Sequence, residues 1–108
     1  MPRVLVVGSA NVDFTVTVAR LPRAGETVSG GTLLVNRGGK GANQAIAARR
    51  LGAEVRLIGC VGDDEPGRDV RGALQREGVG VAGVSVGAAA TGTALIVVDA
   101  EGRNQIAV

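Results

Sequence analysis

Histidine, tryptophan and tyrosine are absent from the 108 residues, and Phe14 is the only aromatic residue. Without histidine, catalysis by a histidine base is excluded and a zinc site is not expected. Without aromatic side chains there is no platform on which nucleic acid bases could stack. The basic residues are scattered, and the net charge is only +2. We therefore expect no nucleic acid partner.

The chain has a single cysteine, Cys60, and no long apolar run. One cysteine cannot form an internal disulfide and fits a reducing compartment. An apolar run of about 18 residues, which a membrane-spanning helix requires, is not found, nor is a charged-then-apolar leader. We therefore expect a cytoplasmic protein with no membrane partner. Cys60 lies in an apolar segment, which predicts a small residue of the core.

Glycine, with 18 residues, is abundant and falls at the ends of expected elements. Short apolar runs at residues 3–8 and 54–61 predict buried parallel strands, and residues 79–86 a third strand or a connector. Helical spacing predicts one helix over 42–51, closed by Gly52, and a second from 62–64 to Gly78. Strands joined by helices predict an α/β fold with a parallel sheet and flanking helices.

Other segments alternate between apolar and polar residues. Residues 14–19 and 27–35 show this pattern, the second interrupted by Gly30 and Gly31, which could form a bulge. Residues 93–99 and 103–108 flank 99-DAEGR-103, a hairpin signal. These segments predict a separate small sheet with one solvated face. The final NQIAV stops inside a strand pattern, so we expect the chain to be cut rather than finished.

The stretch 36-NRGGKGANQA-45 is a glycine-rich loop that opens a helix. It does not fit a Walker A loop, because Leu34 stands where a glycine is required and Gly41 where Ser or Thr is required. The dinucleotide fingerprint fails at Gln44. A ligand at this loop could bind to free N–H groups of the helix, to Lys40 and to the amide of Asn43. These groups would suit a neutral polyol and an anion equally well. The alternative is a plain glycine turn with Lys40 in solvent.

A second polar pair follows the first predicted strand, in 8-GSANVD-13. Asn11 and Asp13 lie just past a strand's carboxyl end, where open α/β sheets bind ligands. Two residues apart in an extended segment, their side chains can point the same way and hold a sugar diol. The alternative is an Asx-type turn.

Three consecutive acidic residues occur at Asp63, Asp64 and Glu65. They suggest either a metal site or the start of a helix. We favour the start of the helix, because an aspartate N-cap accounts for their position.

Several motifs occur in the order and at the spacing of one family. They are VVGSANVD, LPRAGETVSG, GGKGANQAIAARRLGAEVRLIGCVGDD and TGTALIVVDAEGRNQIAV. Across essentially all 108 residues they resemble the N-terminal part of the ribokinase-like (PfkB) carbohydrate kinase family. The family's first signature falls on Gly38, Gly39, Gly41, Asn43, Ala45, Gly52 and Gly62. The resemblance implies ATP-dependent phosphorylation of a sugar. GGKGANQ resembles most the members that convert D-ribose to ribose 5-phosphate, with a related pentose or nucleoside as the alternative.

The resemblance also implies where a sugar would bind. Asn11 and Asp13 would bind its hydroxyls, and the site would be completed by Gly39, Lys40, Gly41 and Asn43. Strands at about 14–19, 27–36, 93–98 and 103–108 would form a β lid that pairs with the lid of a second copy in a homodimer. The full-length enzyme would use ATP, Mg²⁺ and a monovalent cation (K⁺).

The family's second signature, D-T-x-G-A-G-D, does not occur in these residues. It carries the family's catalytic aspartate. We therefore expect residues 1–108 to be the N-terminal part of a sugar kinase domain whose ATP-binding and catalytic part is absent. No catalytic, cofactor-binding or metal-binding residue is expected in this chain, and the isolated chain is expected to be inactive. The alternatives are a non-catalytic sugar-binding module and a truncated remnant with an exposed apolar sheet face.

Overall fold

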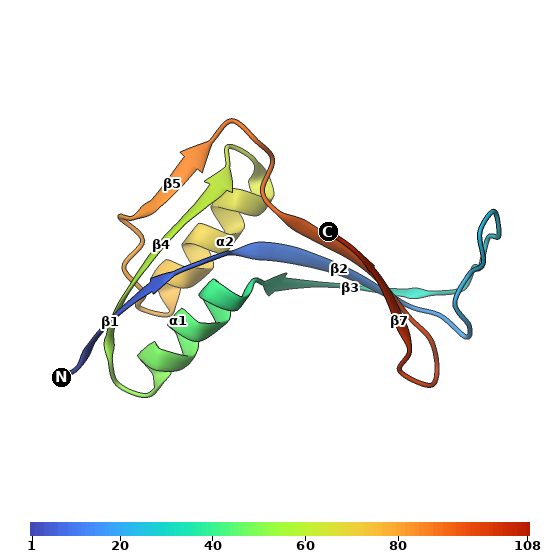
Figure 1. The fold of residues 1–108 in the computed structure, drawn as a ribbon, viewed down its shortest axis with the longest axis horizontal. Helices are drawn as coiled ribbons and strands as arrows, with labels where there is room; N and C mark the ends of the chain where they lie inside the picture. The colour runs from blue at the N-terminus through green and yellow to red at the C-terminus, as the bar shows by residue number, and fades with distance from the viewer. The chain divides into compact units, whose positions relative to one another are not determined.

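The computed structural model describes all residues from 1 to 108. The chain forms two compact units, and each draws on separate stretches of the sequence (Figure 1). The α/β unit consists of Met1–Val12 and Arg37–Gly92, and the β unit of Asp13–Asn36 and Thr93–Val108. The mixed α/β fold with a parallel sheet and a second small sheet is confirmed.

The α/β unit contains a three-stranded parallel sheet in the order β1-β4-β5. The strands are β1 (Arg3–Val7), β4 (Glu54–Gly62) and β5 (Val84–Gly87). The helices are α1 (Lys40–Arg50), which contacts β1 and β4, and α2 (Glu65–Arg76), which contacts β4. Both predicted helices and the first two predicted strands are thus found. The third strand is shorter than residues 79–86, although an isolated bridge joins Gly80 to Arg56.

The core of this unit lies between the helices and one face of the sheet. Val55, Leu57 and Val61 of β4 are buried on that face, and Leu57, opposite Val6 in β1, is fully buried. The other face is open, with Leu5, Val7 and Ile58 exposed by 61%, 73% and 43%. The predicted burial of these strands therefore holds for one face only, because both helices cover the same face.

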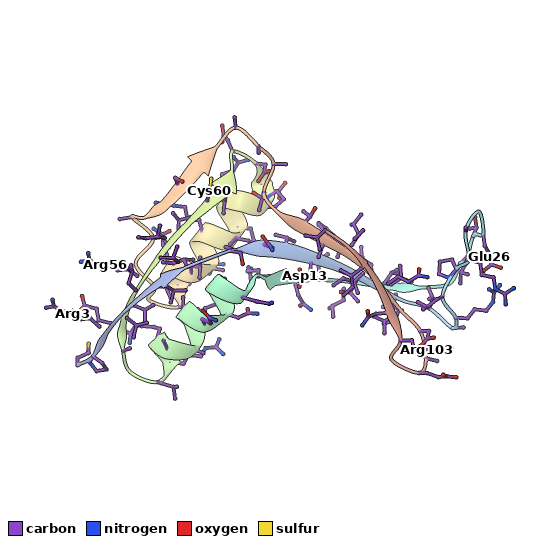
Figure 2. The ribbon with its side chains drawn as sticks, viewed as in Figure 1. Arg3, Asp13, Glu26, Arg56, Cys60 and Arg103 are labelled. Carbon is purple, nitrogen blue, oxygen red and sulfur yellow. The ribbon has the colours of Figure 1, made fainter.

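The exposure of Cys60 follows from the same alternation of buried and exposed residues along β4. This residue lies two residues after Ile58 in β4 and shares the open face, so its thiol is exposed (Figure 2). The prediction that Cys60 is a core residue is wrong. An apolar run indicates a buried strand, but it does not show which of the strand's two faces is covered.

The β unit contains most of a four-stranded sheet in the order β3-β2-β6-β7. Its strands are β2 (Asn11–Thr17), β3 (Thr32–Gly38), β6 (Thr93–Val98) and β7 (Asn104–Ala107), and β2 and β3 each extend by two residues into the α/β unit. Residues 27–31 form no strand, and Gly30, with φ of +84°, lies in a connection rather than in a bulge.

The predicted hairpin is confirmed at β6 and β7, which pair antiparallel with Ile96 opposite Ile106. Asp99 closes it: its carboxylate accepts hydrogen bonds from the amides of Glu101 and Arg103, each at 2.9 Å. The Arg103 guanidinium adds a third bond at 2.8 Å. Neither helix of the structure has the length and apolar character that crossing a bilayer demands.

Candidate functional site

The start of α1 packs directly against the connection between β1 and β2. A Cβ at Gly41 would lie 2.5 Å from the Ser9 nitrogen, and one at Gly39 would lie 2.6 Å from the Ser9 carbonyl oxygen. Gly39 also has φ of +96°, which other residues rarely adopt. The Ser9 carbonyl accepts a hydrogen bond from the Ala42 amide at 2.8 Å. These glycines therefore allow backbone to pack closely on backbone.

Two backbone donors and two side chains remain at this helix end. The Ala42 amide is bound to Ser9 and the Asn43 amide to the Gly39 carbonyl, which leaves the N–H groups of Lys40 and Gly41 as donors. The side chains of Lys40 and Asn43 are exposed and form no hydrogen bond within the protein. The end of the helix is thus positively polarised and has no side-chain cap.

Asn11 begins β2, two residues after Ser9, and is half-buried. Its carboxamide lies beside Gly92, so that a Cβ added at Gly92 would overlap the Asn11 Oδ1 and require this side chain to move. The adjoining backbone is fixed by a hydrogen bond from the Val12 amide to the Gly92 carbonyl at 3.0 Å. The Asn11 side chain forms no hydrogen bond, so the Asx turn considered as the alternative is not formed.

Asp13 is the third residue of β2 and belongs to the β unit (Figure 2). Residues two apart on a strand project from the same face, so Asp13 follows Asn11 along one side of β2. The structure thus places five of the six predicted site residues in the α/β unit, around Ser9 and the start of α1: Asn11, Gly39, Lys40, Gly41 and Asn43.

Asp64 is the N-cap of α2, which confirms the helix-start interpretation of the acidic run. Its carboxylate accepts a hydrogen bond from the Gly67 amide at 2.8 Å. The carboxylate also accepts hydrogen bonds from the hydroxyl and the amide of Thr91. Together with the bond from the Gly67 amide, these bonds lower the pKa of Asp64. No group of three or more acidic or cysteine side chains is arranged to hold a metal ion.

Two contacts near this region have no signal in the sequence. One is the Asp64–Thr91 pair, separated by 27 residues. The other joins Arg37, just before the glycine loop, to Asp69 of α2 through two hydrogen bonds of 3.0 and 3.1 Å. The Arg37 guanidinium lowers the pKa of Asp69. Paired substitutions at these positions in related sequences would be the signal that could reveal such contacts.

Comparisons with known proteins identify the family of the chain. The family model described as pfkB family carbohydrate kinase matches residues 1–108. Ribokinase of Bacillus subtilis (strain 168) is 46% identical over 109 residues, which cover 100% of this chain and 37% of that protein.

Solved structures show the same similarity. Ribokinase from Cryptococcus neoformans in complex with ADP superposes with a TM-score of 0.84 at 41% identity, covering 99% of this chain and 34% of that one. Arabidopsis thaliana ribokinase complexed with ribose and ATP gives a TM-score of 0.84 at 39% identity, covering 98% and 35%. The chain spans about a third of the length of these relatives. On the strength of the match over its whole length, the chain belongs to the pfkB family of carbohydrate kinases.

Proposed function

We propose that this chain supplies the sugar-binding part of a kinase that transfers a phosphoryl group from ATP to D-ribose, giving ribose 5-phosphate. The similar proteins are named ribokinases, and one of them is complexed with ribose and ATP. The observation that carries the proposal is the start of α1. There, backbone N–H groups and the unpaired side chains of Lys40 and Asn43 follow a loop anchored next to Asn11.

The available groups suit hydroxyls. Asp13 and Asn11 would accept hydrogen bonds from neighbouring hydroxyls, and a carboxylate can hold two of them. Lys40 and the Gly41 N–H would donate to sugar oxygens, while Asn43 can both donate and accept. Gly39 would contribute by shape alone, because its positive φ and lack of a Cβ set the path of the loop. Polar groups of both kinds favour a polyol over a simple anion.

ATP, Mg²⁺ and K⁺ are part of the proposed reaction, but we assign none of them to residues of this chain. The glycine loop fits neither nucleotide-binding spacing, and no cluster of acidic residues could hold a metal ion. Bound ATP with its metal would supply the phosphoryl group. Residues 1–108 would bind and orient the acceptor, and we propose that they do not catalyse the transfer alone.

The β unit is proposed as the lid of the sugar site. Its strands β2, β3, β6 and β7 correspond to the predicted lid strands, apart from residues 27–31. Several large apolar side chains are exposed on it, among them Leu33, Leu95 and Ile106 at 63%, 59% and 56%. An exposed apolar sheet is typical of an interface, which supports pairing of two lids in a homodimer.

A titration of the purified chain with ribose tests the binding part of the proposal. Asp13→Ala should weaken ribose binding about 10- to 100-fold, because hydrogen bonds to a charged group contribute about 1.5–3 kcal/mol. Asp63→Ala is the matched control, since Asp63 is exposed and pairs only with Arg68 at 3.2 Å. Absence of heat at millimolar ribose would refute sugar binding by this chain. Unchanged affinity in Asp13→Ala would refute the role of that residue.

A coupled assay for ATP consumption tests the catalytic part. The purified chain should consume no ATP in response to ribose, and ribose-dependent turnover would contradict its assignment as the binding portion. The alternative, a kinase for another pentose or for a nucleoside, is distinguished by repeating the titration with deoxyribose and a nucleoside. If deoxyribose or a nucleoside bound more tightly than ribose, that compound would replace ribose as the proposed substrate.

A further inference from the structure

Thr91 is almost fully buried, at 4% exposure, and its polar groups are shared between two segments. Its hydroxyl donates to Asp64 at 2.5 Å and accepts from the Gly62 amide at 2.9 Å. Its own amide donates to the second carboxylate oxygen of Asp64 at 2.9 Å. With the bond from Gly67, the Asp64 carboxylate accepts three hydrogen bonds. We call this arrangement of Gly62, Asp64, Gly67 and Thr91 the Asp64–Thr91 clip.

The clip leaves no free space. A Cβ at Gly62 would lie 2.6 Å from both the Ala89 carbonyl oxygen and the Thr91 nitrogen. A Cβ at Gly67 would lie 2.7 Å from the Thr91 hydroxyl and closer still to the Gly62 carbonyl oxygen. Such packing admits neither water nor a larger side chain. The position of Thr91 is therefore fixed by the turn between β4 and α2.

Fixing Thr91 also fixes Gly92, the last residue of the α/β unit. The Gly92 carbonyl accepts a hydrogen bond from the Val12 amide, and a Cβ added at Gly92 would overlap the Oδ1 of Asn11. Asn11 has no hydrogen bond of its own that would hold its side chain. Gly92 lacks a side chain and leaves room for the Asn11 carboxamide beside it, so the position of Gly92 bears on where this group can point.

We propose that the Asp64–Thr91 clip is a positioning device that holds Gly92 against Asn11 and so orients the Asn11 amide for the sugar. The proposal deepens the function proposed above and rests on it for the identity of the ligand. Asp64 and Thr91 do not contact the sugar in this scheme. They act through Gly92. Substitution of either residue should therefore change the orientation of the Asn11 side chain even in chains that remain folded.

The test compares side-chain amide resonances of Asn11 in NMR spectra of the 108-residue chain, with and without ribose. Thr91→Val keeps the shape of the side chain and removes the hydroxyl, whereas Thr91→Ser keeps the hydroxyl. Asp64→Asn removes one of the two bonds from Thr91, because the NH₂ that replaces one carboxylate oxygen cannot accept a hydrogen bond. Gly92→Ala displaces Asn11 directly and sets the scale of the shift, and Asp63→Asn is the matched acidic control.

We expect Thr91→Val and Asp64→Asn to shift the Asn11 amide resonances toward those of Gly92→Ala and to weaken ribose binding about tenfold, the effect of one misplaced hydrogen bond. Thr91→Ser and Asp63→Asn should resemble the parent chain. Unmoved Asn11 resonances in the folded Thr91→Val or Asp64→Asn chain would overturn the proposal. If the parent chain binds no ribose, the proposed function fails, while the Asn11 resonances still decide whether the clip positions this residue.

Discussion

Replacing Gly41 with alanine tests whether the glycine loop is built for packing of backbone on backbone. The new Cβ would lie 2.5 Å from the Ser9 nitrogen and 2.7 Å from the Gly8 carbonyl carbon. Ordinary contact begins near 3.4 Å, so α1 and the β1–β2 connection would have to separate by roughly 0.9 Å. Since both partners are backbone, no change of rotamer can relieve the overlap.

The magnitude follows from two opposing terms. Overpacking of this kind costs about 1–3 kcal/mol, and the helix preference of alanine over glycine returns at most about 1 kcal/mol. Subtracting about 1 kcal/mol from this cost leaves a net loss of up to about 2 kcal/mol in the free energy of unfolding, which lowers the Tm by up to roughly 15 °C in a chain of this size. Urea and thermal unfolding followed by far-UV circular dichroism measure both quantities.

Gly72→Ala in α2 provides the matched control. Its added Cβ would meet only the end of the Arg76 side chain, at 3.3 Å, which can move away. There the helix preference of alanine should stabilise the chain by up to about 1 kcal/mol. Equal stability of Gly41→Ala and Gly72→Ala would refute the packing argument and leave ligand contact as the reason for a glycine at position 41.

Three further predictions concern the α/β unit. Leu57→Ala should lower the free energy of unfolding by about 2–5 kcal/mol, because Leu57 is 0% exposed, whereas Ile58→Ala on the open face should cost far less in the same urea titration. The Cys60 thiol should react with Ellman's reagent in the native chain, and protection until unfolding would contradict its exposed position. Arg37 lowers the folded-state pKa of Asp69, so their pairing stabilises the chain above about pH 4 and is lost as the pH falls through that pKa. Arg37→Gln should accordingly show a weaker loss of stability on acidification in unfolding curves recorded between pH 6 and pH 2.

The elements that sequence patterns located well are those whose signals are local. Helix α1 starts one residue after Gly39, and α2 starts after its N-cap Asp64. The hairpin was found because 99-DAEGR-103 combines a carboxylate that binds amides ahead of it with a glycine, Gly102, at φ of +81°. In each case the residues that specify the feature are neighbours along the chain.

The errors arose where the outcome depends on distant partners. Residues 27–31 have an alternating pattern, yet a strand forms only where a neighbouring strand can pair with it, and pairing begins at Thr32. Cys60 and Ile58 lie in an apolar run, but their exposure depends on which face of the sheet the helices cover. Thr91 stands among alanines and glycines, and its structural role comes from its contacts with the distant residues Asp64 and Gly62.

The structure changes what the glycines of GGKGANQ imply about binding. A glycine-rich loop suggests room for a ligand. Here, however, the backbone of residues 8–10 already occupies the space beside Gly39 and Gly41 where a side chain would lie. Their effect is to bring the N-terminus of α1 next to the start of β2, which carries Asn11. Recognition of a sugar would then depend on Asp13 and on the groups that this packing leaves unpaired. These are the N–H groups of Lys40 and Gly41 and the side chains of Lys40, Asn43 and Asn11. A substitution at a glycine should therefore reduce stability and binding together, whereas a substitution at Asn43 should reduce binding alone.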